Sequence, residues 1–190
     1  MYNKMQSDLI LVVEPAGSGN WLRSTNPMNT SETANLRREE TSDEPFLFQV
    51  YASTRAEELA LTNWDDATRQ DFLTMQFQAM RRGYRDMFPA GEFSVIEVSG
   101  QPVGRMVLNR SAQEIRVVDI ALLPPHRNRG IGTILIRRVC SEATTAGLVV
   151  RLSVLKNSGA VRWYERLNFR KIGESALHEE MEWRGAGQPA

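Results

Sequence analysis

The segment DIALLPPHRNRGIGTILI, residues 119–136, joins an apolar strand to an apolar helical stripe through a turn that holds two glycines. The first backbone amides of a helix have no internal acceptors, and together with the helix dipole they favour an anion. Gly130 and Gly132 can adopt positive φ and leave no Cβ in the way of a phosphate, while Arg127 and Arg129 add positive charge. The segment therefore predicts a phosphate-binding turn, although glycines that only shape the turn would give the same pattern.

Two common phosphate loops do not match this segment. The dinucleotide fingerprint requires a third glycine where this chain has Leu135. The nucleoside-triphosphate loop requires Lys and then Ser or Thr, where the chain has Thr133 and Ile134. Neither of these two functions is predicted.

The spacing Arg127-x-x-Gly130-x-Gly132 resembles the Q/R-x-x-G-x-G/A signature of the GNAT superfamily of N-acetyltransferases. The resemblance continues through LVVRLSVL (148–155) and KNSGAVRWYERLNFRKIG (156–173), which are similar to the fifth strand and the carboxy-terminal Asn…Tyr helix of that family. It implies an α/β (α+β) fold with a mixed, mostly antiparallel central sheet, splayed central parallel strands and flanking helices. It also implies that acetyl-CoA is the acetyl donor.

The resemblance assigns residues to the coenzyme. The backbone groups of Ile120 and Leu122 are expected beside the pantetheine arm, and the side-chain amide of Asn157 is expected to contact the same arm. Asn157 could equally satisfy the start of its helix, as asparagine often does. The expected coenzyme-binding residues are Ile120, Leu122, Arg127, Asn128, Arg129, Gly130, Ile131, Gly132, Thr133 and Asn157.

Two residues are candidates for proton transfer, because the resemblance implies that the acetyl group moves directly to an amine. Tyr164 stands where the family commonly places a tyrosine whose hydroxyl approaches the coenzyme sulfur, and a phenol with a pKa near ~10 is protonated at neutral pH. It could instead belong only to the buried face of its helix. Asp119 could accept the amine proton, or it could pair with an arginine such as Arg116 or Arg151; Glu114 is a weaker substitute for this base.

Composition argues against several other functions. Lys and Arg together number 23, as do Asp and Glu, so the net charge does not favour nucleic acid, and the arginines within 127–138 leave DNA binding as a minor alternative. A single cysteine, Cys140, and two histidines allow no intramolecular disulfide and no metal cluster. The run LILVV (9–13) is far shorter than the ~20 residues that span a bilayer. We therefore expect a cytoplasmic protein without a metal, a nucleic-acid partner or a membrane partner; a homodimer is left open.

The chain divides by composition into three parts. Residues 1–34 are rich in Gly, Pro, Ser, Thr and Asn and lack a sustained period, which predicts a flexible N-terminal extension. Residues 35–184 carry regular patterns and form the predicted N-acetyltransferase domain. Residues 185–190 form a short C-terminal tail.

Alternating strand and helix patterns across this domain favour a covered, partly parallel sheet. One helical stripe, expected to pack on the sheet, consists of Leu73, Phe77, Met80, Tyr84 and Met87. Predicted strands are 46–54, 92–98, 102–110, 114–123, 148–155, 170–175 and 178–184. Predicted helices are 54–61, 67–88, 133–147 and 158–169.

The function predicted from these observations is transfer of an acetyl group from acetyl-CoA to a primary amine of a small molecule or peptide. The amino-terminal helices border the acceptor in similar proteins, so residues 81–88 are where acceptor choice is expected. The alternative is a catalytically idle acetyl-CoA-binding domain with a regulatory or assembly role. Tyr164 counts against this alternative.

Overall fold

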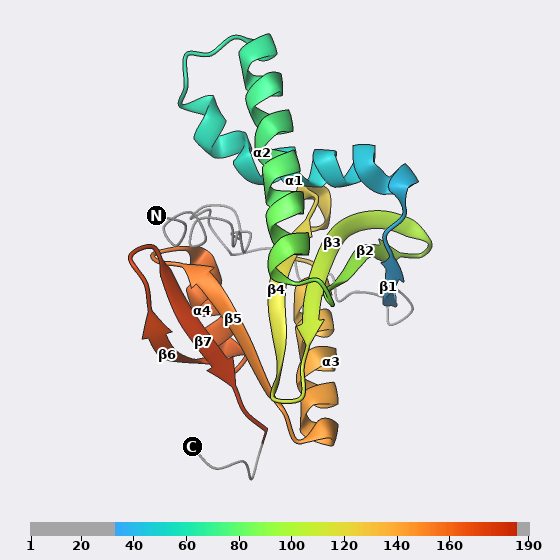
Figure 1. Cartoon of the computed structure of the whole chain (residues 1–190), viewed down its shortest axis with the longest axis vertical. Helices are drawn as coiled ribbons and strands as arrows, with labels where there is room; N and C mark the ends of the chain where they lie inside the picture. The colour runs from blue at the N-terminus through green and yellow to red at the C-terminus, as the bar shows by residue number, and fades with distance from the viewer. Residues whose placement is uncertain (1–32, 186–190) are drawn as a thin grey trace.

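The computed structural model describes residues 33–185 of the 190-residue chain (Figure 1). The strands are β1 (Ala34–Arg38), β2 (Glu92–Val98), β3 (Gln101–Arg110), β4 (Glu114–Leu122), β5 (Val149–Leu155), β6 (Arg170–Glu174) and β7 (His178–Trp183). The α-helices are α1 (Glu44–Ala60), α2 (Asp66–Met87), α3 (Ile131–Ala146) and α4 (Gly159–Arg166), with 3-10 turns at Thr41–Asp43 and Pro124–His126. The predicted extension and tail lie outside the described residues apart from positions 33, 34 and 185.

The described strands form one seven-stranded sheet in the order β1-β2-β3-β4-β5-β7-β6. Every neighbouring pair is antiparallel except β4 and β5, which run parallel. Helices α1 and α2 pack on one face of the sheet, and α3 and α4 pack on the other (Figure 1). The predicted fold class, a mixed and mostly antiparallel sheet with flanking helices, is confirmed.

Strands β4 and β5 separate toward one end of the sheet, as Figure 1 shows. Their parallel pairing covers only residues 114–117 of β4 and 149–152 of β5. Residues 118–122 and 153–155 therefore form the two arms of a fork. Within the described residues, no strand pairs with the β4 edge that faces this fork. The splayed parallel strands of the prediction are thus present.

A bulge in β4 decides which side of the sheet Asp119 faces. Val107 of β3 pairs with Asp119, but the following residue of β3 pairs with Val117, so Val118 is an extra residue in β4. Val117 and Ile120 belong to the core under α3, whereas Val118 belongs to the core under α1 and α2. Asp119 faces the α1–α2 side as well. The side chains of the consecutive residues Asp119 and Ile120 therefore lie on opposite faces of the sheet.

The prediction of a strand over 46–54 is wrong, because these residues belong to α1. In α1, the buried residues Val50 and Tyr51 follow Leu47 by three and four positions, which places all three on one face of the helix. Pro45 lies in the first turn, where its missing amide costs no helical hydrogen bond. Phe, Val and Tyr gave the segment a strand-like composition, but burial against α2 and the sheet selects the helix.

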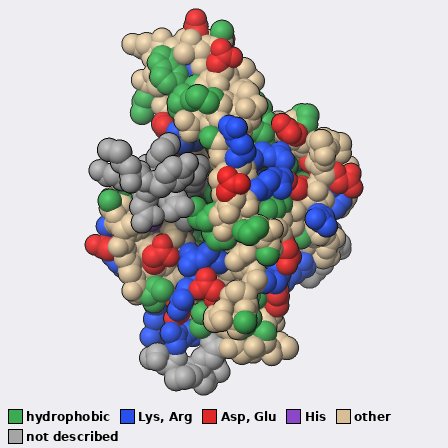
Figure 2. Space-filling view, viewed as in Figure 1, with side chains coloured by type: hydrophobic (Ala, Val, Ile, Leu, Met, Phe, Trp, Pro, Cys, Tyr) green, Lys and Arg blue, Asp and Glu red, His purple; other side chains and the backbone are tan. Residues whose placement is uncertain are grey.

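Helix α2 carries the predicted stripe. Phe77, Met80 and Tyr84 are buried against the sheet, and the prediction that they pack there is confirmed. Helices α1 and α2 extend past the sheet as a projecting pair, and hydrophobic side chains gather on the surface of that projection (Figure 2). Leu61 and Trp64 lie exposed between the two helices in sequence.

Candidate active site

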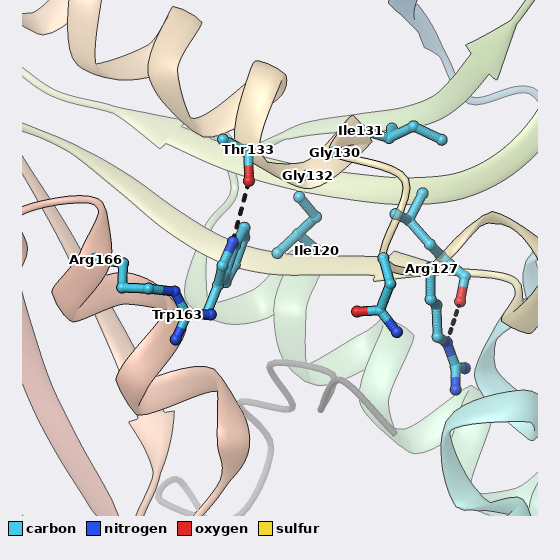
Figure 3. Close-up of a pocket in the computed structure, with 10 residues that line it drawn as sticks. Ile120, Arg127, Gly130, Ile131, Gly132, Thr133, Trp163 and Arg166 are labelled. Carbon is cyan, nitrogen blue, oxygen red and sulfur yellow. Dashed lines mark hydrogen bonds between the residues drawn. The ribbon is translucent and has the colours of Figure 1, made fainter. Parts of the chain in front are cut away.

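A pocket opens where β4 ends and α3 begins, and α4 forms its opposite wall (Figure 3). The space between its walls, counted together with the open solvent at its mouth, is about 660 Å³. Its lining is Ile120, Leu122, Arg127, Asn128, Gly130, Ile131, Gly132, Thr133, Trp163 and Arg166. The structure therefore brings most of the residues predicted to bind the coenzyme around one cavity.

The N-terminus of α3 contributes backbone groups to this pocket. Gly130 is the N-cap residue, it has the left-handed φ of 82°, and no side chain caps the helix there. The hydrogen bond from the Ile134 amide to the Gly130 carbonyl, at 3.0 Å, closes the first turn. The amides that precede Ile134 have no acceptor four residues back within the helix. An anion placed here would accept from those amides and would lie at the positive end of the helix dipole.

Gly132 lies within α3 and has no positive φ, but the structure gives a packing reason for glycine at this position. A Cβ at Gly132 would lie 3.2 Å from Cζ2 of Trp163 and 3.3 Å from Cη2, so glycine admits the indole against the helix. The Trp163 indole Nε1 donates to Thr133 Oγ1 at 3.2 Å (Figure 3). Trp163 and Arg166 were not among the site residues predicted from the sequence. The sequence feature that could have identified them is their spacing of three residues, which places both on one face of α4.

Arg127 lies against the pocket, but its guanidinium turns toward α1 (Figure 3). Its Nε donates to the Leu122 carbonyl at 2.8 Å. Its Nη2 donates to the Ser53 hydroxyl at 3.0 Å and to the Ser53 carbonyl at 3.2 Å. Arg127 therefore links the end of β4 and the loop to helix α1 in addition to placing a charge near the pocket.

We expect Arg127→Ala to lower the melting temperature and to weaken acetyl-CoA binding, because it removes all of these bonds. Each such bond contributes about 1 kcal/mol, and 1 kcal/mol shifts the melting temperature by about 2–4 °C in a domain of this size. Arg127→Lys keeps the charge but not the planar fork, so it should resemble the alanine variant. Thermal unfolding and calorimetry with acetyl-CoA would measure both effects. Full affinity in the lysine variant would show that only the charge matters.

Tyr164 is fully buried on α4, beside the pocket and not in its lining. Its ring centroid lies 4.5 Å from that of Trp163 and 5.2 Å from that of Phe169. Its hydroxyl has no hydrogen-bond partner among residues 33–185. Burial raises the pKa of this hydroxyl well above its ordinary value, and the charge of Asp119 raises it further. Tyr164 therefore stays protonated throughout the pH range in which the protein would work.

Asp119 is fully buried and pairs with Arg105, whose Nε lies 2.6 Å from its Oδ2. The expected pairing with an arginine is therefore present, but the partner is Arg105 and not Arg116 or Arg151, the two examples named from the sequence. The bulge in β4 is the reason, because it turns Asp119 toward β3 and the α1–α2 face. Burial raises the pKa of the Asp119 carboxyl, and Arg105 offsets part of this rise through its charge and hydrogen bond. Oδ1 has no hydrogen-bond partner in the described part of the chain.

Arg116 and Arg151 instead hold Glu114, each at 3.0 Å. They extend this ion-pair network to Glu180 and Glu182 of β7. Glu114, the substitute base in the sequence analysis, is thus shared between two arginines at the closed end of the fork.

Two residues predicted to bind the coenzyme lie outside the lining of the pocket. Arg129 is exposed in the loop before α3. Asn157 is exposed before α4 and adopts a left-handed φ of 62°. The N-cap of α4 is the next residue, Ser158, and no side chain makes a cap hydrogen bond there. Coenzyme contacts from Arg129 and Asn157 stay predictions.

Cys140 is buried on α3, and burial raises the pKa of its thiol to about 12. A thiol of this kind is a poor nucleophile, because the thiolate is the reactive form. Within residues 33–185, no group of three or more His, Cys, Asp and Glu side chains could hold a metal ion. No helix in this range is long and apolar enough to cross a bilayer.

Comparisons with known proteins agree with this geometry. The profile of the Acetyltransferase (GNAT) family matches residues 45–169. An uncharacterized N-acetyltransferase of Methanocaldococcus jannaschii is 36% identical over 88 residues, which are 42% of this chain and 39% of that protein. The match thus spans well under half the length of this curated relative.

Two solved structures share the fold. PaiA N-acetyltransferase from Thermoplasma acidophilum, in complex with coenzyme A, superposes with a TM-score of 0.59 at 14% identity and covers 80% of this chain and 99% of its own. An acetyltransferase from Thermus thermophilus gives a TM-score of 0.59 at 17% identity, with 80% and 97% coverage. The family match, the strand order and the forked sheet lead to one conclusion: this chain belongs to the GNAT family of acetyltransferases.

Proposed function

We propose that this protein transfers an acetyl group from acetyl-CoA directly to a primary amine of a small molecule or peptide. The observation that carries the proposal is that two adjacent residues of β4, at the fork in the sheet, face opposite sides. Ile120 lines the pocket at the α3 N-terminus, while the adjacent Asp119 presents a buried carboxyl on the opposite face. Acetyl-CoA supplies the thioester, and its reactive carbon would lie where an amine can approach from the Asp119 side.

The residues of the pocket fit the coenzyme. The amides at the start of α3 would hold the pyrophosphate, because they are donors at the positive end of a helix dipole. The indole of Trp163 and the guanidinium of Arg166 form the opposite wall. The backbone of residues 120–122, on the β4 edge without a paired strand, would hydrogen-bond the pantetheine amides and place an N–H near the thioester oxygen.

Two buried groups, Asp119 and Tyr164, would transfer the protons of the reaction. An ammonium acceptor loses one proton before it attacks and a second as the amide forms, while the departing thiolate gains one, so each turnover releases one proton to solvent. Asp119 would accept a proton from nitrogen, and its raised pKa makes it a stronger base than an ordinary carboxylate. Tyr164 would donate its hydroxyl proton toward sulfur and recover one from solvent.

A thiol-release assay with acetyl-CoA and a panel of amines tests the proposal. The panel contains polyamines, amino acids, aminoglycosides and peptide amino termini, and mass spectrometry identifies the acetylated product. We expect acceptor-dependent thiol release with at least one class, and Asp119→Asn should slow it by roughly 10²-fold or more. Tight acetyl-CoA binding by calorimetry, without release for any amine, would favour an idle coenzyme-binding domain.

A further inference from the structure

Helix α2 presents a second stripe of residues on the face that points away from the sheet. Phe77, Met80 and Tyr84 pack on the sheet. At about 100° per residue, the opposite face carries four apolar or small residues, which we call the outer stripe: Phe72, Met75, Ala79 and Gly83. Met75 is 56% exposed, and Ala79 is exposed on the next turn. A helix that packs on one sheet needs one apolar stripe, so the outer stripe suits contact with another surface.

The outer stripe begins on the part of α2 that extends past the sheet (Figure 1). There Trp64, which is 40% exposed, lies against Phe72, with 5.1 Å between their ring centroids. Met75 follows within one turn, and Figure 2 shows hydrophobic side chains on the surface of this projection. Single exposed apolar residues are normal on a protein surface, but a contiguous patch of them marks an interaction surface.

The outer stripe changes from large to small side chains along the helix. Phe72 and Met75 occupy its first half, and Ala79 and Gly83 occupy its second half. If a second copy of α2 is placed on this face in the antiparallel direction, with the two-fold axis near the level of residue 77, Phe72 lies opposite Gly83 and Met75 opposite Ala79. Large side chains of each helix then fill the space above the small residues of the other, which lets the two helices pack closely. A parallel arrangement would instead place large residues against large ones.

Two charges beside the outer stripe favour the same arrangement. Asp71 and Arg82 are exposed, and neither makes an ion pair among residues 33–185. They lie about 16 Å apart along the helix axis, so they cannot pair with each other within one chain. The antiparallel arrangement brings Asp71 of each copy beside Arg82 of the other, in a register that agrees within one residue with the register set by side-chain size. Asp86 on the same face falls opposite Thr68, so no like charges meet.

We infer that two copies of this chain associate through the outer face of α2, as a two-fold antiparallel helix pair with reciprocal Asp71–Arg82 ion pairs. A two-fold dimer requires a self-complementary surface, and here both side-chain size and charge are self-complementary. Asp65 and Asp66 flank the projection and disfavour an anionic lipid surface as the partner. The contact spans only a few helical turns, so we expect a small interface that dissociates at micromolar concentrations. The inference is independent of the proposed acetyltransferase activity.

Sedimentation velocity of the full chain across the micromolar range tests for the dimer. We expect the sedimentation coefficient to rise with concentration. Ala79→Glu should weaken the dimer at least about 100-fold, because it places a charge without a partner at the centre of the contact. Gln70→Glu is the matched control, because it adds the same charge at an exposed position on the opposite side of α2 and should leave the dimer unchanged.

Reversal of the two charges tests the antiparallel arrangement. Asp71→Arg and Arg82→Asp each place like charges side by side twice in the dimer, so each should weaken it at least about 10-fold. The double variant restores both ion pairs across the interface and should recover the dimer. Such recovery cannot come from within one chain, because the two positions are too far apart along the helix. Circular dichroism and thermal unfolding check that each variant keeps the fold.

Three results would contradict the inference. The chain could remain monomeric throughout the micromolar range, which would leave this face without a second copy as its partner. A dimer that persists unchanged in Ala79→Glu would have to form through another surface. Failure of the double charge variant to recover the dimer would refute the antiparallel arrangement with its reciprocal ion pairs.

Discussion

Replacing Gly132 by valine is expected to lower the affinity for acetyl-CoA at least about 100-fold, which corresponds to about 2.7 kcal/mol. The Cβ alone would lie 3.2 Å from the Trp163 indole, and the two methyl groups of valine have no room beside it. The indole would have to leave Thr133 Oγ1 and shift into the pocket. The substitution therefore changes the shape of the site at the amides that would bind the pyrophosphate.

A graded series makes this expectation specific. Gly132→Ala should have a smaller effect than valine, because the indole must move by only a few tenths of an ångström. Gly130→Val should weaken binding for a different reason: there is open space around its Cβ, but a β-branched residue is strained at a φ of 82°. Arg129→Ala removes an exposed charge without an ion pair among residues 33–185 and should cost on the order of 1 kcal/mol or less.

Calorimetry of these four variants with acetyl-CoA would decide between the loop backbone and the loop charges as the source of affinity. Circular dichroism and thermal unfolding control for loss of the fold. Similar weakening by Arg129→Ala and Gly132→Val would contradict the backbone explanation.

Local sequence signals predicted most of the fold, because most elements carry strong ones. The hairpin of β2 and β3 is joined by Ser99 and Gly100, both with positive φ, and its two strands were predicted from the turn residues that separate them. Gly147 ends α3 in the left-handed conformation expected of a C-cap glycine. The strand prediction for residues 46–54 failed because Phe, Val and Tyr favour a strand, and only tertiary burial selects the helix.

The parts of the candidate site that are contiguous in sequence could be predicted. The parts that depend on the register of β4 against β3 could not. The loop at 127–133 is continuous in sequence, so most of its residues meet in one pocket. The partner of Asp119 could not be found in this way, because a one-residue bulge in β4 decides which face the carboxyl occupies. Arg105, the actual partner, carries its charge within an apolar run of β3, and that buried charge was the only signal.

The hydroxyl of Tyr164 is the second group for which we expect a large effect. It is fully buried and has no hydrogen-bond partner within the described range, although a buried hydroxyl normally has one. Its raised pKa keeps the proton in place at neutral and mildly alkaline pH. The raised pKa makes this hydroxyl a weaker acid in the free protein, so it would give up its proton only when a negative charge forms beside it, as on a departing thiolate.

Tyr164→Phe should therefore lower kcat by roughly 10²-fold and leave acetyl-CoA affinity nearly unchanged, because the ring contacts with Trp163 and Phe169 remain. The deficit should shrink as pH rises past ~8.5, where a thiolate no longer needs a proton. The melting temperature should stay the same or rise, since the substitution removes an unpartnered polar group from the interior. Steady-state kinetics on both sides of the thiol pKa, from about pH 6 to about pH 10, with thermal unfolding as the control, measure all three effects. A variant with wild-type kcat and a lower melting temperature would make Tyr164 a packing residue, as its helix face alone would predict.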